Sequence, residues 1–159
     1  MTESAGTGTE SPPVSGESHD EDGHLPDTAV VIRGGTMDDI ERMDNQAEAC
    51  KLKLGFRGIS VCSWPGLTAQ EVAQRVKELR ARRRQRVLMN PEMRQSTAGR
   101  IRRAGTQDRH PFDLVQTFWD GHWTLTLPDP TTPEDWRLLD EAFDPPEPNP
   151  VGQKAYGNA

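Results

Sequence analysis

Apolar residues in the first half of the chain follow two alternating patterns. Short runs of adjacent apolar residues, such as those at 29–32, are followed by stretches in which apolar residues recur every third or fourth position, as at Ile40, Met43 and Ala47. The first pattern is typical of a buried strand and the second of an amphipathic helix. Because each can bury its apolar side only against another layer, the alternation predicts a sheet covered by helices.

Turn and capping residues set the bounds of these elements. Gly34 and Gly35 end the first strand, and Thr36 with Asp39 forms the capping-box pattern that begins a helix. Gly55 is a typical C-terminal stop for that helix. The same signals predict strands at 57–62 and 86–89 and a second helix that begins after Thr68.

The second half of the chain contains a hairpin and two further helices. Asp120 and Gly121 are a two-residue hairpin signal between two apolar runs. A short helix capped by Ser96 or Thr97 precedes the hairpin, and a final helix begins at Thr132. We therefore expect a single mixed-sheet domain of the α/β or α+β class, ordered strand-helix-strand-helix-strand-helix-hairpin-helix, with partly parallel strand pairing.

Both ends of the chain differ in composition from the part between them. Residues 1–28 contain acidic side chains, no Lys or Arg and few large apolar residues, which predicts a disordered acidic tail. Residues 145–159 begin with a Pro-rich stretch, which favours an extended tail. The predicted globular mixed α/β domain is therefore 29–144.

Composition also excludes several classes of protein. The 159 residues include only two cysteines, and no apolar run is long enough to span a bilayer. The N-terminus lacks the apolar core of a signal peptide. We expect a cytoplasmic protein with no membrane partner, no metal and no cofactor. Cys50 and Cys62 are expected to be packing residues, because they lack the spacing of a zinc site.

Basic side chains are concentrated between residues 71 and 103, although the chain has a net charge of -6. Clustered arginines attract phosphate groups, and binding to a nucleic-acid backbone needs several such cations. The alternative is an ordinary helix cap followed by a solvated arginine face. The candidate phosphate-binding or nucleic-acid-binding residues are Arg82, Arg83, Arg84, Arg86, Ser96, Thr97, Arg100, Arg102 and Arg103.

Arg33, Ser60 and His122 are the candidate catalytic residues. Arg33 lies where a buried strand meets a helix start, a common place for a bound anion, and alternatively pairs with a carboxylate in the following turn. His122 follows the hairpin turn. It forms an acid–base pair with Asp120, faces a cleft with Arg33 and Ser60, or is a surface histidine. Catalysis requires the three candidate side chains to converge.

Two resemblances add to this reading. Over residues 29–150 the chain resembles small uncharacterised proteins of GC-rich Gram-positive bacteria, in the ordered blocks VIRGG, GFRGISV, QSTAGRIRRAG, TLTLP and PNP. That resemblance implies a cytoplasmic protein with a similar core and brings no activity with it.

The second resemblance is partial. Arg33-Gly34 and Ser96-Thr97 are similar, in order, to the strand arginine and the Ser-Thr-Ser motif of ADP-ribosyltransferases. That family also has a catalytic glutamate in a Q/E-x-E loop, and none of the downstream glutamates has this setting. The resemblance implies an enzyme of that type, but it covers only the arginine and the Ser-Thr motif and lacks the catalytic glutamate.

The sequence therefore predicts a binding module rather than an enzyme. Its partner carries phosphate groups, as nucleic acid does, and binds the Arg-rich surface. One alternative is a protein-interaction component of a toxin–antitoxin or phage-defence pair, in which the tails bind a protein partner. The other alternative is a small enzyme of the ADP-ribosyltransferase type that uses Arg33, Ser60 and His122.

Overall fold

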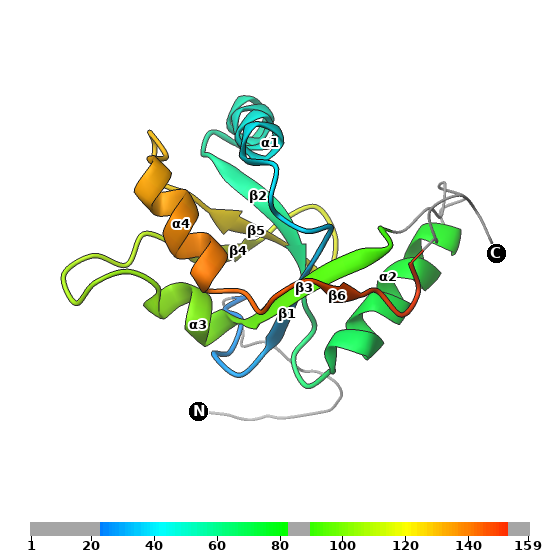
Figure 1. Ribbon diagram of the computed structural model, residues 1–159. Coiled ribbons are helices and arrows are strands. Elements are labelled where there is room, and N and C mark those ends of the chain that lie inside the picture. The colour runs from blue at the N-terminus through cyan, green and yellow to red at the C-terminus, as the bar shows by residue number, and fades with distance from the viewer. Residues whose placement is uncertain (1–22, 83–89, 153–159) are drawn as a thin grey trace, which may run out of the picture.

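The computed structural model describes residues 23–82 and 90–152. Within these ranges the chain forms one curled six-stranded sheet and four helices (Figure 1). In chain order the elements are β1 (Val30–Gly34), α1 (Ile40–Leu54), β2 (Gly58–Cys62), α2 (Ala69–Arg82), β3 (Glu92–Thr97), α3 (Ala98–Arg103), β4 (Asp113–Gln116), β5 (His122–Thr126), α4 (Pro133–Glu141) and β6 (Glu147–Pro148).

The strand order is β4-β5-β2-β1-β3-β6, and every strand pair in the described residues is antiparallel. The predicted mixed α and β class is confirmed, whereas the expectation of partly parallel pairing is wrong. The reason lies in α1, which is beyond the strand ends instead of running back along a face of the sheet (Figure 1). A helix placed in this way joins neighbouring antiparallel strands, so alternation along the chain does not determine strand direction.

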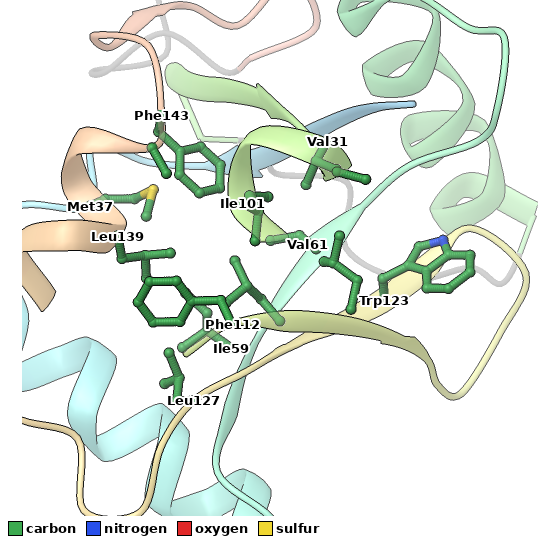
Figure 2. Close-up of a cluster of buried hydrophobic side chains, with 14 of the residues drawn as sticks. Val31, Met37, Ile59, Val61, Ile101, Phe112, Trp123, Leu127, Leu139 and Phe143 are labelled. Carbon is green, nitrogen blue, oxygen red and sulfur yellow. The ribbon is translucent and has the colours of Figure 1, made fainter. Parts of the chain in front are cut away.

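Two hydrophobic clusters lie on opposite faces of the sheet. The α4-side core contains the inward residues of β2 and β5 together with side chains from α3 and α4, including Ile59, Trp123 and Leu139 (Figure 2). The α2-side core lies under α2 and includes Val72 and Met93. Both cores share β1, because consecutive residues of a strand point to opposite faces.

The folded part begins earlier than expected. Leu25, predicted to lie in the disordered tail, is fully buried in the α4-side core. The neighbouring Asp27 accepts a hydrogen bond from Gly99 N through its main-chain oxygen, and its carboxylate pairs with Arg102 and Arg103. These contacts join residues far apart in sequence, which explains why local composition did not reveal them.

The third strand is also in a different place. The predicted strand at 86–89 lies outside the described residues, and β3 runs through a polar stretch instead. Thr97 is confirmed as a helix cap, because its hydroxyl accepts a hydrogen bond from Arg100 N. Ser96 belongs to the strand. Sequence periodicity missed β3 because it buries polar side chains, Arg94 among them.

The predicted hairpin is present with a longer turn. Residues 117–121 connect β4 to β5, where the sequence predicted a two-residue turn. Gly121 has a φ of +91°, and a Cβ at this position would lie 1.9 Å from the ring of Trp64. The Trp64 indole N–H donates to Asp120. The Asp-Gly pair therefore serves the packing of Trp64 as well as the turn.

The Pro-rich stretch packs on the sheet as far as it is described. β6 pairs with β3 through Glu147 opposite Met93, and Asn149 N donates to the carbonyl of Pro91. An edge strand is the place where a sheet tolerates proline. In the described ranges, each helix is too short or too polar to cross a membrane.

Candidate functional site

Strands β1 and β2 pair at one end and diverge at the other. Their register is set by Ile32 opposite Cys62, whereas β1 pairs with β3, and β2 with β5, along the whole strand. Beyond Ile32 the guanidinium of Arg33 lies between the two strands. Its Nη1 donates to the main-chain oxygen of Ser60 at 2.7 Å, and its Nη2 donates to Gln46 Oε1 on α1 at 2.6 Å. Arg33 therefore supplies a donor where the backbone ladder is interrupted.

A pocket of about 700 Å³ opens at this divergence. Its walls come from β1 and the following loop, α1, β2, α2, the start of β3 and the β4–β5 turn. The volume lies within the range of small-molecule sites. The polar side chains that line it are Arg33, Thr36, Asp38, Asp39, Arg42, Gln46, Ser60, Cys62, Arg80, Asn90, Glu92, Trp119, His122 and Asn149.

Arg33 carries a positive charge that no carboxylate of the described residues offsets by an ion pair. Its two hydrogen-bond acceptors are a carbonyl and an amide, both neutral. Burial, and then the neighbouring Arg42, lower the pKa of Arg33 to about 10. The side chain therefore stays cationic at neutral pH in surroundings that disfavour its charge.

The carboxylates next to Arg33 in sequence are otherwise engaged. Asp38 accepts from the hydroxyl of Thr36, and Asp39 caps α1 by accepting from Arg42 N. The alternative in which Arg33 pairs with a carboxylate of the following turn is therefore wrong. The N-cap role of Asp39 explains this outcome, because its carboxylate satisfies the first turn of α1.

Ser60 and His122 form a hydrogen-bonded pair inside the pocket. Ser60 is exposed on β2, and its Oγ lies 3.2 Å from Nε2 of His122 on β5. The register places Cys62 opposite His122 and Ser60 opposite Thr124, so Ser60 and His122 are diagonal neighbours on one face. Such neighbours are within reach of long side chains.

The imidazole of His122 is fixed on its other side. Its Nδ1 lies 2.9 Å from the hydroxyl of Thr117, which in turn lies 2.8 Å from the hydroxyl of Thr124. The rings of Phe118 and Trp119 pack on the imidazole with centroids 5.1 Å and 5.2 Å away. Burial lowers the pKa of His122, and a hydrogen bond to the Thr117 main chain partly opposes this effect. The imidazole is therefore neutral at pH 7.

The structure brings the three candidate catalytic residues into one pocket. Arg33 contacts the Ser60 main chain, and the Ser60 hydroxyl contacts His122. The alternative acid–base partner of His122, Asp120, instead accepts from the Trp64 indole. Cys62 also lines the pocket, and burial raises the pKa of its thiol to about 11. It is therefore a protonated wall residue at neutral pH.

The arginines of α3 each have a carboxylate partner. Arg100 pairs with Asp144, Arg102 with Asp27 and Asp113, and Arg103 with Asp27, at N–O distances of 2.7 to 3.6 Å. These arginines are therefore not left uncovered by carboxylates, although the side chains of Arg100 and Arg103 stay 39% and 67% exposed, and phosphate binding by this segment remains a prediction. Arg82 is exposed at the end of α2, and Arg83, Arg84 and Arg86 lie outside the described residues.

Ser96 and Thr97 have structural partners as well. The Ser96 side chain is buried, and its hydroxyl donates to the carbonyl of Ala142 at the end of α4 at 2.5 Å. The hydroxyl of Thr97 caps α3. Neither hydroxyl is directed to a phosphate site, so the segment from β3 into α3 anchors α4.

Sequence reasoning missed several residues of the pocket. Gln46 and Arg42 are on the polar side of α1, and Arg80 is on α2. Thr117, which holds His122, sits in the turn that was expected to be shorter. The hydrophobic pattern of a helix shows which side packs on the sheet, and it carries no signal for a polar side chain that reaches a gap between strands.

No group of three or more His, Cys, Asp or Glu side chains with the geometry of a metal site occurs in residues 23–82 and 90–152. The comparisons with other proteins give no relative from which a role can be transferred. Neither the family models, nor the curated proteins, nor the solved structures include a significant match to this chain.

Proposed function

We propose that the protein binds a small phosphate-bearing molecule in the pocket between β1 and β2, with Arg33 as the main contact. The supporting observation is the half-buried guanidinium of Arg33, which has neutral hydrogen-bond partners and no ion pair with a carboxylate of residues 23–82 and 90–152. A phosphate group carries the negative charge that would offset this guanidinium, and its oxygens can accept hydrogen bonds from the remaining guanidinium N–H groups. Arg42, the neighbouring cation, adds a second favourable charge.

The lining favours a small ligand over a nucleic-acid strand. Asp38, Asp39 and Glu92 also line the pocket, so a long polyanion would meet repulsion there. A nucleic-acid surface needs several uncovered cations, and the arginines of α3 are engaged in ion pairs. The proposed ligand is thus still a phosphate-bearing molecule, as expected from the sequence, but the proposed site is the pocket between β1 and β2 instead of the arginines of residues 82–103.

Titration with inorganic phosphate, followed by calorimetry and by backbone amide shifts, tests this proposal. Arg33→Gln should raise the Kd for phosphate at least about tenfold, because it removes a charge-assisted hydrogen bond. Arg42→Gln, a change at an exposed position, should raise the Kd by a smaller factor with the fold intact. Arg137→Gln is the matched control, since Arg137 lies on α4 and pairs with Glu134 and Glu141.

Two results would overturn the proposal. One is phosphate binding by Arg33→Gln and Arg42→Gln with the wild-type Kd. The other is an amide-shift map centred on the arginine segment of α3 instead of β1 and β2. Circular dichroism spectra of each variant show whether a loss of binding reflects the site or a loss of fold.

A further inference from the structure

We propose, in addition, that Ser60 and His122 are a nucleophile and its base, and that they cleave the acyl group of a small ester in this pocket. This activity goes beyond phosphate binding, and its two reacting side chains, Ser60 and His122, are not the proposed phosphate contacts. Its geometric basis is the hydrogen bond between Ser60 Oγ and His122 Nε2, at 3.2 Å, in a pocket open to ligand. That distance is within the looser range that nucleophile–base pairs show without substrate.

The hydrogen-bond chain behind His122 gives the imidazole a defined role. When Nδ1–H donates to the Thr117 hydroxyl, that hydroxyl can donate to Thr124, and Nε2 is left as an acceptor facing Ser60. This arrangement satisfies all three contacts at once. A serine needs such an acceptor, because its hydroxyl is a weak nucleophile until a base takes its proton. Thr117 is therefore a positioning residue.

The proposed reaction is a two-step acyl transfer to water. The Ser60 oxygen attacks the ester carbonyl carbon while His122 Nε2 takes the hydroxyl proton. The bond to the leaving alcohol then breaks, and the imidazolium gives its proton to the alcohol oxygen. Water attacks the acyl-serine in the same way, with His122 first taking and then returning a proton. The products are an alcohol and a carboxylic acid, and Ser60 is regenerated.

Arg33 supplies positive charge next to the reacting centre. Its guanidinium binds the main-chain oxygen of Ser60, which keeps the charge beside the attacked carbonyl. A cation held in place by the protein stabilises the oxyanion that forms on attack. Gln46 holds the other nitrogen of the guanidinium and so limits its movement.

The direct test uses the full chain with a fluorophosphonate probe and p-nitrophenyl acetate. Peptide mapping should place the probe on Ser60, and Ser60→Ala should abolish labelling and lower kcat/KM at least about a hundredfold. Ser63→Ala is the matched control. Ser63 lies on the same segment, but its hydroxyl is buried and donates to the carbonyl of Val30, so labelling and kcat/KM should persist.

His122 and Thr117 are tested by the pH profile. His122→Gln should abolish turnover. In the wild type, kcat/KM should rise with pH through an ionisation below 6.5 and be level at neutral pH, because burial favours the neutral imidazole. Thr117→Val should lower kcat about tenfold with little change in KM, and it should shift this ionisation. The other titratable or charged groups around His122 are Cys62 of β2, Arg33 and Arg80 in the pocket, and Lys53 of α1 near Phe118.

The outcomes separate this inference from phosphate binding. Probe labelling of the wild type reports the nucleophile, and calorimetric titration of the wild type with inorganic phosphate reports the anion site, so the two readouts are independent. Absence of labelling in the wild type, labelling at another serine, or unchanged turnover in Ser60→Ala would each overturn the nucleophile assignment. If the wild type does not bind phosphate but Ser60 is still labelled, only the proposed function is overturned.

Discussion

Within the part of the chain that the structure describes, two arginines, Arg57 and Arg94, are almost completely buried, and each connects distant segments. Arg57 pairs with Asp44 and Glu48 of α1 and donates to Thr131. Arg94 pairs with Asp140 and donates to main-chain oxygens at the end of α4. A helix C-terminus has unpaired carbonyls and partial negative charge, which a guanidinium can satisfy.

Replacement of Arg94 by Met should destabilise the protein by about 3 kcal/mol, because the Asp140 carboxylate and several carbonyls lose their donor. Arg137→Met removes an exposed, solvent-screened arginine from the same helix and should destabilise the protein much less than Arg94→Met. Urea unfolding followed by circular dichroism measures both changes. Equal losses for the two variants would contradict the structural role of Arg94.

At the level of single residues, the sequence was informative about Arg33, Ser60 and His122. Each was placed by a local signal: a strand end, a strand interior or a hairpin turn. The sequence does not determine whether the three converge, because convergence depends on how β1, β2 and β5 pair. Ser96 was interpreted as a helix cap or a phosphate contact, whereas its hydroxyl donates to Ala142, 46 positions away.

Among the elements, those with capping signals were predicted best. Thr132 forms a complete capping box with Asp135, and α4 begins directly after it, as expected. α1 ends before Gly55 as expected, but the predicted Thr36–Asp39 capping box is not formed: Asp39 itself caps the helix, and the Thr36 hydroxyl donates to Asp38. β3 was missed because polar residues occupy its buried positions. A sequence shows hydrogen bonds between neighbouring residues, such as helix caps. It does not show that a buried polar side chain will find its hydrogen-bond partner on another element.

The turn before β5 gives a prediction at this scale. Gly121→Ala should destabilise the protein by about 2 to 3 kcal/mol, because it combines a positive φ with a clash against Trp64. Gly55→Ala has nearly the same φ, +89°, and an added Cβ there has nothing within 4 Å. It should cost only about 1 kcal/mol. Thermal unfolding of both variants measures the difference, and equal shifts in Tm would show that Trp64 packing does not restrict Gly121.

The whole molecule has two cores that share one sheet. Val31 points into the α4-side core and Ile32 into the α2-side core, so β1 cannot leave one without disturbing the other. Parallel pairing was expected because strand and helix patterns alternate, and strand direction remained undetermined until the position of α1 was known. Likewise, local composition placed Leu25 in the predicted tail of residues 1–28, although its side chain is buried in the α4-side core.

This shared strand predicts one cooperative unfolding transition. Val72→Ala in the α2-side core and Leu139→Ala in the α4-side core should each destabilise the whole molecule by about 2 to 4 kcal/mol. Tryptophan fluorescence and far-ultraviolet circular dichroism should report the same midpoint in each variant. Midpoints that separate in Val72→Ala alone would mean that α2 unfolds independently.

The pocket wall extends in sequence from Ile32 to Asn149, which follows β6. A nascent polypeptide emerging from the ribosome thus has its guanidinium, hydroxyl and imidazole groups in place before the wall that encloses them has been translated. Asn149 is therefore the last of the wall residues to be synthesised, and a chain cut ahead of β6 would lack the covalent connection that carries it to the pocket.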